Sequence, residues 1–136
     1  MNNRELMLEA VAAREKSYSP YSGYRVGAAL LTASGKVYLG CNIENSGYSA
    51  TVCAERCAIF KAVSEGERDF VRIAVVGGDG EAISGTCTPC GVCRQVMSEF
   101  CGGGFEILLG TPDDLRVYTL AELLPLQFSD LEGRKA

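Results

Sequence analysis

The spacing of apolar and polar residues along the chain predicts a mixed sheet packed between helices. Residues 3–17 place apolar side chains at helical spacing, which predicts an amphipathic helix. Short apolar runs separated by turn residues predict strands, and Ser34-Gly35 is a turn of the hairpin type between the first two. The predicted strands cover residues 26–33, 36–43, 71–76 and 105–109, with a short fifth piece at 116–118.

Three more helices are predicted between and after these strands. The first is capped by Ser49 or Thr51 and ends near residue 64. The second begins at about Cys90 or Gly91 and ends before three consecutive glycines, and Thr119 caps a short helix at 120–124. Strands that alternate with helices indicate an α/β fold, a three-layer α/β/α sandwich around a mixed, about five-stranded sheet. The 136 residues contain no repeat or linker, so we expect a single domain over residues 1–136.

Composition and charge exclude several classes of partner. Hydrophobic residues make up 47% and charged residues 22%, as in an ordinary globular protein. The formal net charge of −4 disfavours nucleic acid as a partner, because an acidic surface repels phosphates. No apolar run is long enough to span a membrane, and the N-terminus lacks the apolar stretch of a signal peptide. We therefore expect a cytoplasmic protein that acts on a small molecule.

The chain has seven cysteines and no histidine. In a reducing compartment such cysteines are metal ligands or buried thiols rather than disulfides, and the odd number agrees with this. Without histidine, a metal site has to be built from sulfur and carboxylate, and proton transfer has to use a group other than imidazole.

Two short motifs carry the chemistry: Cys53-Ala54-Glu55 and Pro89-Cys90-Gly91-Val92-Cys93, each at the predicted start of a helix. Either motif alone is weak, but the pair is specific. Thiolates suit zinc, and a helix N-terminus lowers the pKa of a cysteine. Residues two apart on a helix point about 200° apart, so Cys53 and Glu55 can face one site only from the first helical turn. The hypothesis therefore requires that Cys53 opens its helix.

Three protein ligands leave one coordination position open, which is the pattern of a catalytic zinc. Three thiolates and Zn²⁺ carry a formal charge of −1, which weakens the metal as a Lewis acid. Arg56 and Arg94 each follow one motif directly, and either could donate hydrogen bonds to the thiolates. We favour Arg56 for this role, with a solvated helix arginine as the alternative.

Together these segments resemble the cytidine deaminase family, specifically its small homotetrameric zinc-dependent form within the cytidine/deoxycytidylate deaminase superfamily. The two motifs match the three-cysteine variant of the nucleobase deaminase signature. The resemblance extends over nearly the whole chain and includes, in the family's order, Tyr21-Ser22-x-Tyr24-x-Val26-Gly27-Ala28-Ala29, Gly40-Cys41-Asn42-Ile43-Glu44-Asn45, Cys53-Ala54-Glu55-Arg56, Pro89-Cys90-Gly91-x-Cys93-Arg94-Gln95 and Leu123-Leu124-Pro125-x-x-Phe128.

The resemblance implies a hydrolase of pyrimidine salvage that converts cytidine and 2'-deoxycytidine to uridine and 2'-deoxyuridine and releases ammonia. It implies one Zn²⁺ per subunit, held by Cys53, Cys90 and Cys93. A zinc-bound hydroxide would attack C4 of the base while Glu55 moves the protons.

Six further residues are expected to bind substrate. Asn42 and Glu44 alternate on a predicted strand and share one face, which by resemblance holds the ribose hydroxyls. The others follow from the resemblance: Tyr24, where the family often has phenylalanine beside the base, Ala54, which offers a backbone N–H to the pyrimidine, and Tyr48 and Phe128, which reach the sites of neighbouring subunits.

Other interpretations remain open from the residues alone. Cys57 could join the three cysteines in a closed structural zinc site, although it is better explained as a small core residue. Cys90 and Cys93 could instead form a thiol–disulfide redox pair, and a non-enzymatic binding module is a weaker alternative. A deaminase of modified nucleoside antibiotics would share the metal motif. Structural or incidental roles are expected for Cys41, Cys87 and Cys101, although Cys87 could compete for the metal.

Overall fold

The computed structural model describes residues 1–83 and 85–128 and contains one five-stranded sheet with the strand order β2-β1-β3-β4-β5. The strands are β1 (Tyr24–Thr32), β2 (Val37–Cys41), β3 (Phe70–Asp79), β4 (Glu106–Thr111) and β5 (Asp114–Thr119). The helices are α1 (Asn3–Arg14), α2 (Ala54–Ser64), α3 (Gly91–Phe100) and α4 (Leu120–Leu123), with a 3₁₀ turn η1 (Tyr48–Ala50). Strands β3 and β4 are parallel and all other neighbours are antiparallel, so the sheet is mixed as expected.

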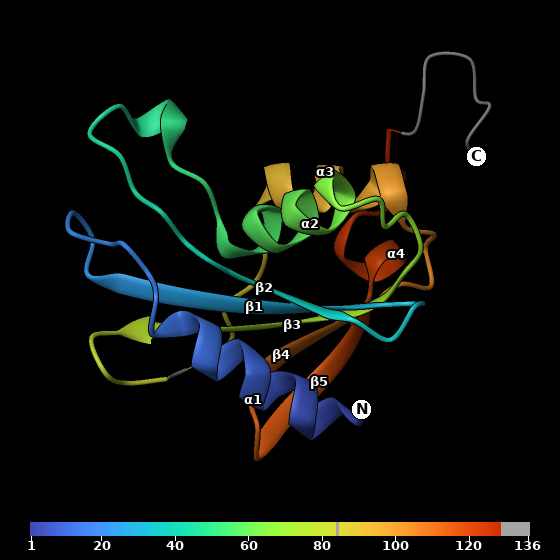
Figure 1. Cartoon of the computed structure of the whole chain (residues 1–136), viewed down its shortest axis with the longest axis horizontal. Helices are drawn as coiled ribbons and strands as arrows, with labels where there is room; N and C mark the ends of the chain where they lie inside the picture. The colour runs from blue at the N-terminus through green and yellow to red at the C-terminus, as the bar shows by residue number, and fades with distance from the viewer. Residues whose placement is uncertain (84, 129–136) are drawn as a thin grey trace.

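Helices cover both faces of the sheet (Figure 1). Helix α1 lies on one face, whereas α2, α3 and α4 lie on the other. Successive residues of a strand point to opposite faces, so Ala28 and Leu30 belong to the core under α2 and α3, while Ala29 belongs to the core under α1. The predicted three-layer α/β fold is therefore confirmed.

Helix α2 lies unusually close to β2 because Gly40 has no side chain. A Cβ atom at Gly40 would stand 2.3 Å from the carbonyl oxygen of Ala54 and 2.5 Å from the backbone nitrogen of Ala58. Any larger residue would push the helix away from the sheet. This contact holds the first turn of α2, which carries Cys53 and Glu55, directly against the sheet.

Arg14 at the end of α1 is 1% exposed, and the sequence does not identify it. Its guanidinium donates hydrogen bonds to the carbonyl oxygens of Arg25, Gly78, Gly80 and Ala82. These carbonyls lie in the ends of β1 and β3 and in the loop that follows β3, and Arg14 supplies hydrogen-bond donors to all four. Arg14 thereby holds the segment after β3 against α1.

Several element boundaries differ from the sequence prediction because of contacts between distant residues. The helix predicted to be capped by Ser49 or Thr51 begins at Ala54 with Cys53 as its N-cap. Val52 exchanges backbone hydrogen bonds with Ile43 and is therefore held extended, which excludes a helix there. Similarly, β3 continues to Asp79, because Gly77 and Gly78 pair with β1 and do not begin the predicted loop. Helix α1 ends at Arg14 rather than at residue 17.

None of the helices among the described residues is both long enough and apolar enough to cross a membrane.

Candidate active site

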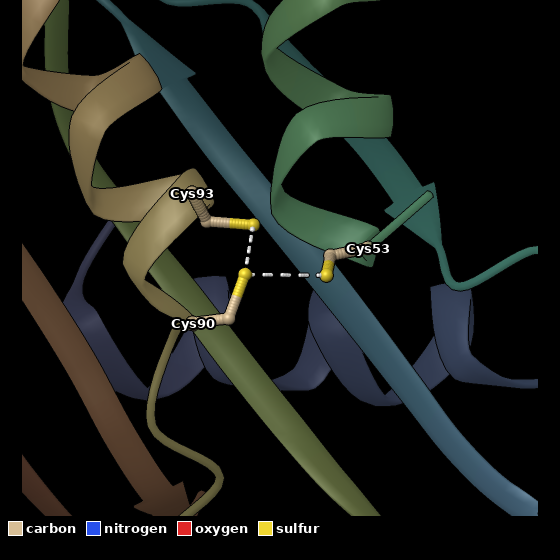
Figure 2. Close-up of side chains that lie close together, drawn as sticks. All are labelled: Cys53, Cys90 and Cys93. Carbon is tan, nitrogen blue, oxygen red and sulfur yellow. Dashed lines mark hydrogen bonds between the residues drawn. The ribbon is translucent and has the colours of Figure 1, made fainter. Parts of the chain in front are cut away.

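Three cysteines from two helices meet at one point above the sheet (Figure 2). Cys53 is the N-cap of α2, Cys90 is the N-cap of α3, and Cys93 lies in the first turn of α3. The Sγ atoms of Cys53 and Cys90 are 3.6 Å apart, and those of Cys90 and Cys93 are 3.5 Å apart. All three sulfurs lie within 4.8 Å of one another. The structure therefore meets the requirement that Cys53 opens its helix.

The two helix N-termini favour thiolates at this point. Neither N-cap side chain accepts a capping hydrogen bond, so backbone N–H groups of both first turns lack that partner, and the positive ends of both helix dipoles lie at the cysteines. Hydrogen bonding with the Cys93 thiol, together with Arg56, lowers the pKa of Cys53 to about 5. The same hydrogen bond, together with burial, raises the pKa of Cys93. The two thiols therefore share a proton, which a bound cation would displace.

The geometry of the three sulfurs fits zinc. Zinc–sulfur bonds are about 2.3 Å long, so two sulfurs on one tetrahedral zinc lie roughly 3.7 Å apart. The two observed separations of 3.6 and 3.5 Å are close to this value. Cys93 is buried and Cys90 is exposed, so the cluster opens toward solvent on one side. Such a centre has three protein ligands and room for a fourth, non-protein one.

Only one of the two neighbouring arginines faces the sulfurs. Nη2 of Arg56 lies 3.4 Å from Sγ of Cys53, and its guanidinium also interacts with the Cys93 thiol. Arg94 instead donates to the carbonyl oxygens of Pro89 and Leu123, which ties α3 to its flanking segments. This arrangement favours Arg56 as the cation that offsets the thiolate charge.

Replacing Arg56 by Gln is expected to weaken zinc binding by about 10- to 100-fold, the usual effect of removing a hydrogen-bonding neighbour of a metal ligand. The measurement is competition for zinc with a chromophoric chelator. Lys61→Gln is the matched control, because it removes one positive charge from the same helix at an exposed side chain that donates to the Leu39 carbonyl oxygen and not to the sulfur cluster. Equal zinc affinities of the two variants would show that Arg56 does not tune the centre.

Glu55 lies beside the cysteines at the start of α2 and is 3% exposed. Burial raises its pKa to about 7. Its carboxylate interacts with the Cys93 thiol and with its own backbone N–H. A carboxyl group with such a pKa exchanges a proton readily near neutral pH, which is the property required of a general acid and base.

A cleft of about 180 Å³ opens in front of this cluster. Its walls include Cys53, Glu55 and Cys90 together with Asn42 and Glu44 from the segment after β2. Strand β2 ends at Cys41, two residues before the predicted end. Asn42 and Glu44 still face one cleft, because the residue between them, Ile43, forms isolated bridges to Tyr18 and Val52 that keep the chain extended.

Protein hydrogen bonds leave part of both polar side chains available. Oδ1 of Asn42 accepts from the Val26 backbone N–H and from Ser17, while Nδ2 donates to the Tyr24 carbonyl oxygen and keeps one free hydrogen. The carboxylate of Glu44 accepts from the backbone N–H groups of Tyr21 and Ser22 and from the Ser22 hydroxyl.

These hydrogen bonds, above all that from the Ser22 hydroxyl, lower the pKa of Glu44 and keep it ionised. Asn42 thus offers one donor to a ligand in the cleft, and Glu44 offers a fixed negative charge.

The other predicted substrate residues occupy different positions. Ala54 lines the cleft, and its N–H lies in the first turn of α2, where no intrahelical acceptor exists. Tyr24 is absent from the cleft wall, and its side chain lies beside Cys87. Tyr48 is 84% exposed and Phe128 is 59% exposed, and neither lines the cleft of its own chain. Tyr48 instead borders a separate surface pocket with Tyr21 and Glu44.

The remaining cysteines are outside the three-sulfur cluster. Cys57 shares a surface pocket of about 450 Å³ with Cys41, so the expectation of a small core residue is wrong. The described residues thus contain no fourth thiol in the metal cluster, which disfavours a closed four-thiolate site. Sequence reasoning missed Cys87, which lines the cleft, as well as Val26, Thr51, Val52 and Thr88. Of these residues, Cys87 alone had a feature in the sequence that pointed to the site, namely its position three residues before Cys90.

Comparisons with known proteins agree with this geometry. Residues 1–105 match the family model described as "Cytidine and deoxycytidylate deaminase zinc-binding region". The chain is 52% identical over 130 residues to a cytidine deaminase of Sporosarcina psychrophila, covering 95% of this chain and 93% of that protein. It is 48% identical over 130 residues to a cytidine deaminase of Halalkalibacterium halodurans, covering 95% and 96%.

A solved structure shares the same fold. The crystal structure of cytidine deaminase from Burkholderia pseudomallei superimposes with a TM-score of 0.87 at 46% identity, covering 94% of this chain and 100% of that one. Two helix N-termini with three converging thiols and a buried glutamate, on a chain this similar in sequence and fold, lead to one conclusion: this chain belongs to the cytidine and deoxycytidylate deaminase family.

Proposed function

We propose that this protein is a zinc-dependent cytidine deaminase, which hydrolyses cytidine and 2'-deoxycytidine to uridine and 2'-deoxyuridine and releases ammonia. The observation that carries the proposal is the convergence of Cys53, Cys90 and Cys93 beside the buried Glu55, where Cys53, Cys90 and Glu55 line one cleft. When bound by the three thiolates, zinc supplies a Lewis acid that lowers the pKa of a water molecule in its open position.

Glu55 performs the proton transfers in this proposal. Its pKa of about 7 lets it accept a proton from water and then return it to N3 of the base and to the departing amino group. Its position in the first turn of α2 holds the carboxylate within reach of the Cys93 thiol, and therefore of the metal site. The buried setting also excludes bulk water, which would otherwise compete for the proton.

Asn42 and Glu44 recognise the sugar in this proposal. Glu44 accepts hydrogen bonds from ribose hydroxyls, and the free Nδ2 hydrogen of Asn42 donates to a ribose oxygen. The charge of Glu44 repels a phosphate, so a nucleoside is preferred over a nucleotide. The free base cytosine offers neither residue a partner. In the same proposal, the free N–H of Ala54 donates to the pyrimidine.

The proposal predicts turnover of cytidine and deoxycytidine with little turnover of cytosine, measured in parallel by loss of absorbance or release of ammonia. Replacing Glu44 by Gln should lower kcat/KM for cytidine by roughly 10- to 100-fold, because a hydrogen bond to a charged group contributes about 1.5–3 kcal/mol. Glu15→Gln, at an exposed carboxylate 3.6 Å from Nη2 of Arg25, is the matched control.

Efficient turnover of cytosine, or a Glu44→Gln variant equal to the control, would contradict this assignment of the sugar site. A modified nucleoside antibiotic in the same panel shows whether the substrate class extends to such compounds.

We further propose that four copies assemble and that Tyr48 and Phe128 complete the clefts of neighbouring subunits. Both aromatic side chains are strongly exposed on the single chain, yet neither lines its own cleft. Exposed aromatic residues of this size are typical of interfaces.

Light scattering on a sizing column should then give about four times the 14.5 kDa of one chain. Tyr48→Ala and Phe128→Ala should lower activity, whereas Leu8→Ala, at an exposed residue of α1, should not. A fully active monomer would contradict the assembly.

The free state of all seven cysteines suits a reducing compartment, and we propose the cytosol as the location. Cell fractionation tests this location.

The alternative of a thiol–disulfide redox pair is disfavoured by the position of Cys90 and Cys93, which share one cluster with Cys53. Stoichiometric zinc without a free reactive thiol pair in the purified protein would argue against a thiol–disulfide oxidoreductase.

A further inference from the structure

Cys87 lies on the wall of the active-site cleft without belonging to the metal cluster. It lines the same cleft as Glu55, Asn42 and Cys90. The charges of Glu55 and Cys53 also act electrostatically on the Cys87 thiol. Among the described residues, the sulfurs close enough to share one metal ion are those of Cys53, Cys90 and Cys93 alone. A thiol so near the reacting groups, with no part in metal binding, therefore requires another explanation.

The space beneath Cys87 is shaped by a glycine and a tyrosine. A Cβ atom at Gly77 of β3 would stand 2.8 Å from Sγ of Cys87 and 3.0 Å from Cε1 of Tyr24. Any side chain at Gly77 would therefore displace both residues. The Tyr24 ring and the Cys87 thiol therefore lie side by side over Gly77, and the tyrosine hydroxyl interacts with the thiol. Tyr24 itself does not line the cleft, so its contact with Cys87 lies outside the cleft wall.

Both members of this pair remain neutral near physiological pH. Burial raises the pKa of Cys87 to about 11, and burial also raises the pKa of Tyr24. A neutral sulfur is small and polarizable and makes favourable contacts with aromatic rings. It can face a planar pyrimidine without adding a charge next to Glu55. The tyrosine hydroxyl has a proton to donate to that sulfur, which gives it a means of orienting the thiol.

We propose that Cys87 contacts the pyrimidine base and helps to determine which bases the cleft accepts, with the Tyr24 hydroxyl as its positioning residue. This inference rests on the proposed function, because it assumes that a cytidine occupies the cleft. The Tyr24 hydroxyl then acts on the substrate indirectly, by orienting the Cys87 thiol. It also explains why Cys87 and Tyr24 occur together above Gly77.

The test measures cytidine affinity in the zinc-loaded Glu55→Gln variant, which allows binding to be followed by calorimetry with little turnover. Cys87→Ala in this background should weaken cytidine binding by about two- to tenfold, the range of a sulfur–ring contact. Cys87→Leu, which places bulk in the cleft, should weaken it further. Cys101→Ala is the matched control, because Cys101 is also a partly buried thiol of raised pKa but lies at the far end of α3.

A double-mutant cycle separates positioning by Tyr24 from a general structural effect. Tyr24→Phe should weaken cytidine binding when Cys87 is present and have little effect when residue 87 is alanine. Zinc content and melting temperature should match those of the parent protein throughout. Equal effects of Tyr24→Phe in both backgrounds would overturn the positioning role.

Unchanged cytidine affinity in both Cys87→Ala and Cys87→Leu would overturn the base contact. Failure of the proposed function gives a different result: the Glu55→Gln parent itself would not bind cytidine and the wild type would not deaminate it. If cytidine binds and is deaminated but ignores every change at Cys87, only the further inference fails.

Discussion

Replacing Glu55 by Gln is expected to lower kcat by a factor of roughly 10²–10⁴, the usual contribution of general acid and base catalysis, while zinc remains bound. Glutamine preserves the shape of the side chain but can neither accept nor return a proton. The cysteine cluster is built from the N-caps and first turn of two helices and does not require the carboxylate for its geometry. Chemistry and metal binding should therefore separate in this variant.

The measurement pairs steady-state kinetics with metal analysis of the same preparation. Glu55→Ala should likewise lose activity while it retains zinc. It should also be less stable, because Glu55 is only 3% exposed and its removal leaves a cavity. Glu15→Gln serves again as the exposed carboxylate control. Near wild-type activity in either Glu55 variant would exclude Glu55 from proton transfer and favour a structural role for the metal.

Replacing Cys93 by Ser is expected to remove zinc and, with it, activity. Cys93 is fully buried and its Sγ is 3.5 Å from that of Cys90. A serine hydroxyl is a poor substitute for a soft, anionic thiolate. Loss of a direct ligand should weaken zinc binding by more than the roughly 100-fold that removing a neighbour of a ligand can cause. The variant should therefore lose its zinc during dialysis against a chelator that leaves the wild type loaded.

Cys57→Ser is the matched control for this experiment. Cys57 lies one helical turn after Cys53, but it lines the separate pocket that also contains Cys41. We expect the Cys57→Ser protein to retain one zinc per chain and its activity. Loss of zinc from both variants to the same extent would contradict the three-thiolate centre and restore the closed four-thiolate alternative.

The sequence predicts an arginine beside the thiolates but does not by itself decide between Arg56 and Arg94. The charge of three thiolates predicts a nearby cation, and Arg56 and Arg94 are equally close along the sequence. The structure brings Arg56 toward the sulfurs and turns Arg94 toward two backbone carbonyls. Which way each guanidinium points depends on residues such as Leu123, far from either motif in the chain. The role of Arg56 in tuning zinc stays a prediction.

Residues missed by the sequence analysis share one property: their role comes from contacts across the fold. Arg14 has the pattern of an ordinary helix arginine, yet it satisfies carbonyls more than 60 residues away, with sequence separations to Gly78 and Gly80 of 64 and 66. Gly77 and Gly78 have the composition of a loop but pair with β1. Periodicity and propensity depend on near neighbours in the chain and carry no information about such contacts.

The sequence by itself determined the layered α/β fold, the two cysteine motifs and the requirement that each motif begin a helix. These features depend on hydrophobic period, turn residues and the short spacing of ligands, all of which are local. The tertiary structure alone decided that Cys53 is the N-cap, because Ile43 holds Val52 extended, and that Cys87 faces the cleft while Cys57 does not. Those outcomes depend on which distant strands and loops pack together, and short-range patterns do not specify that packing.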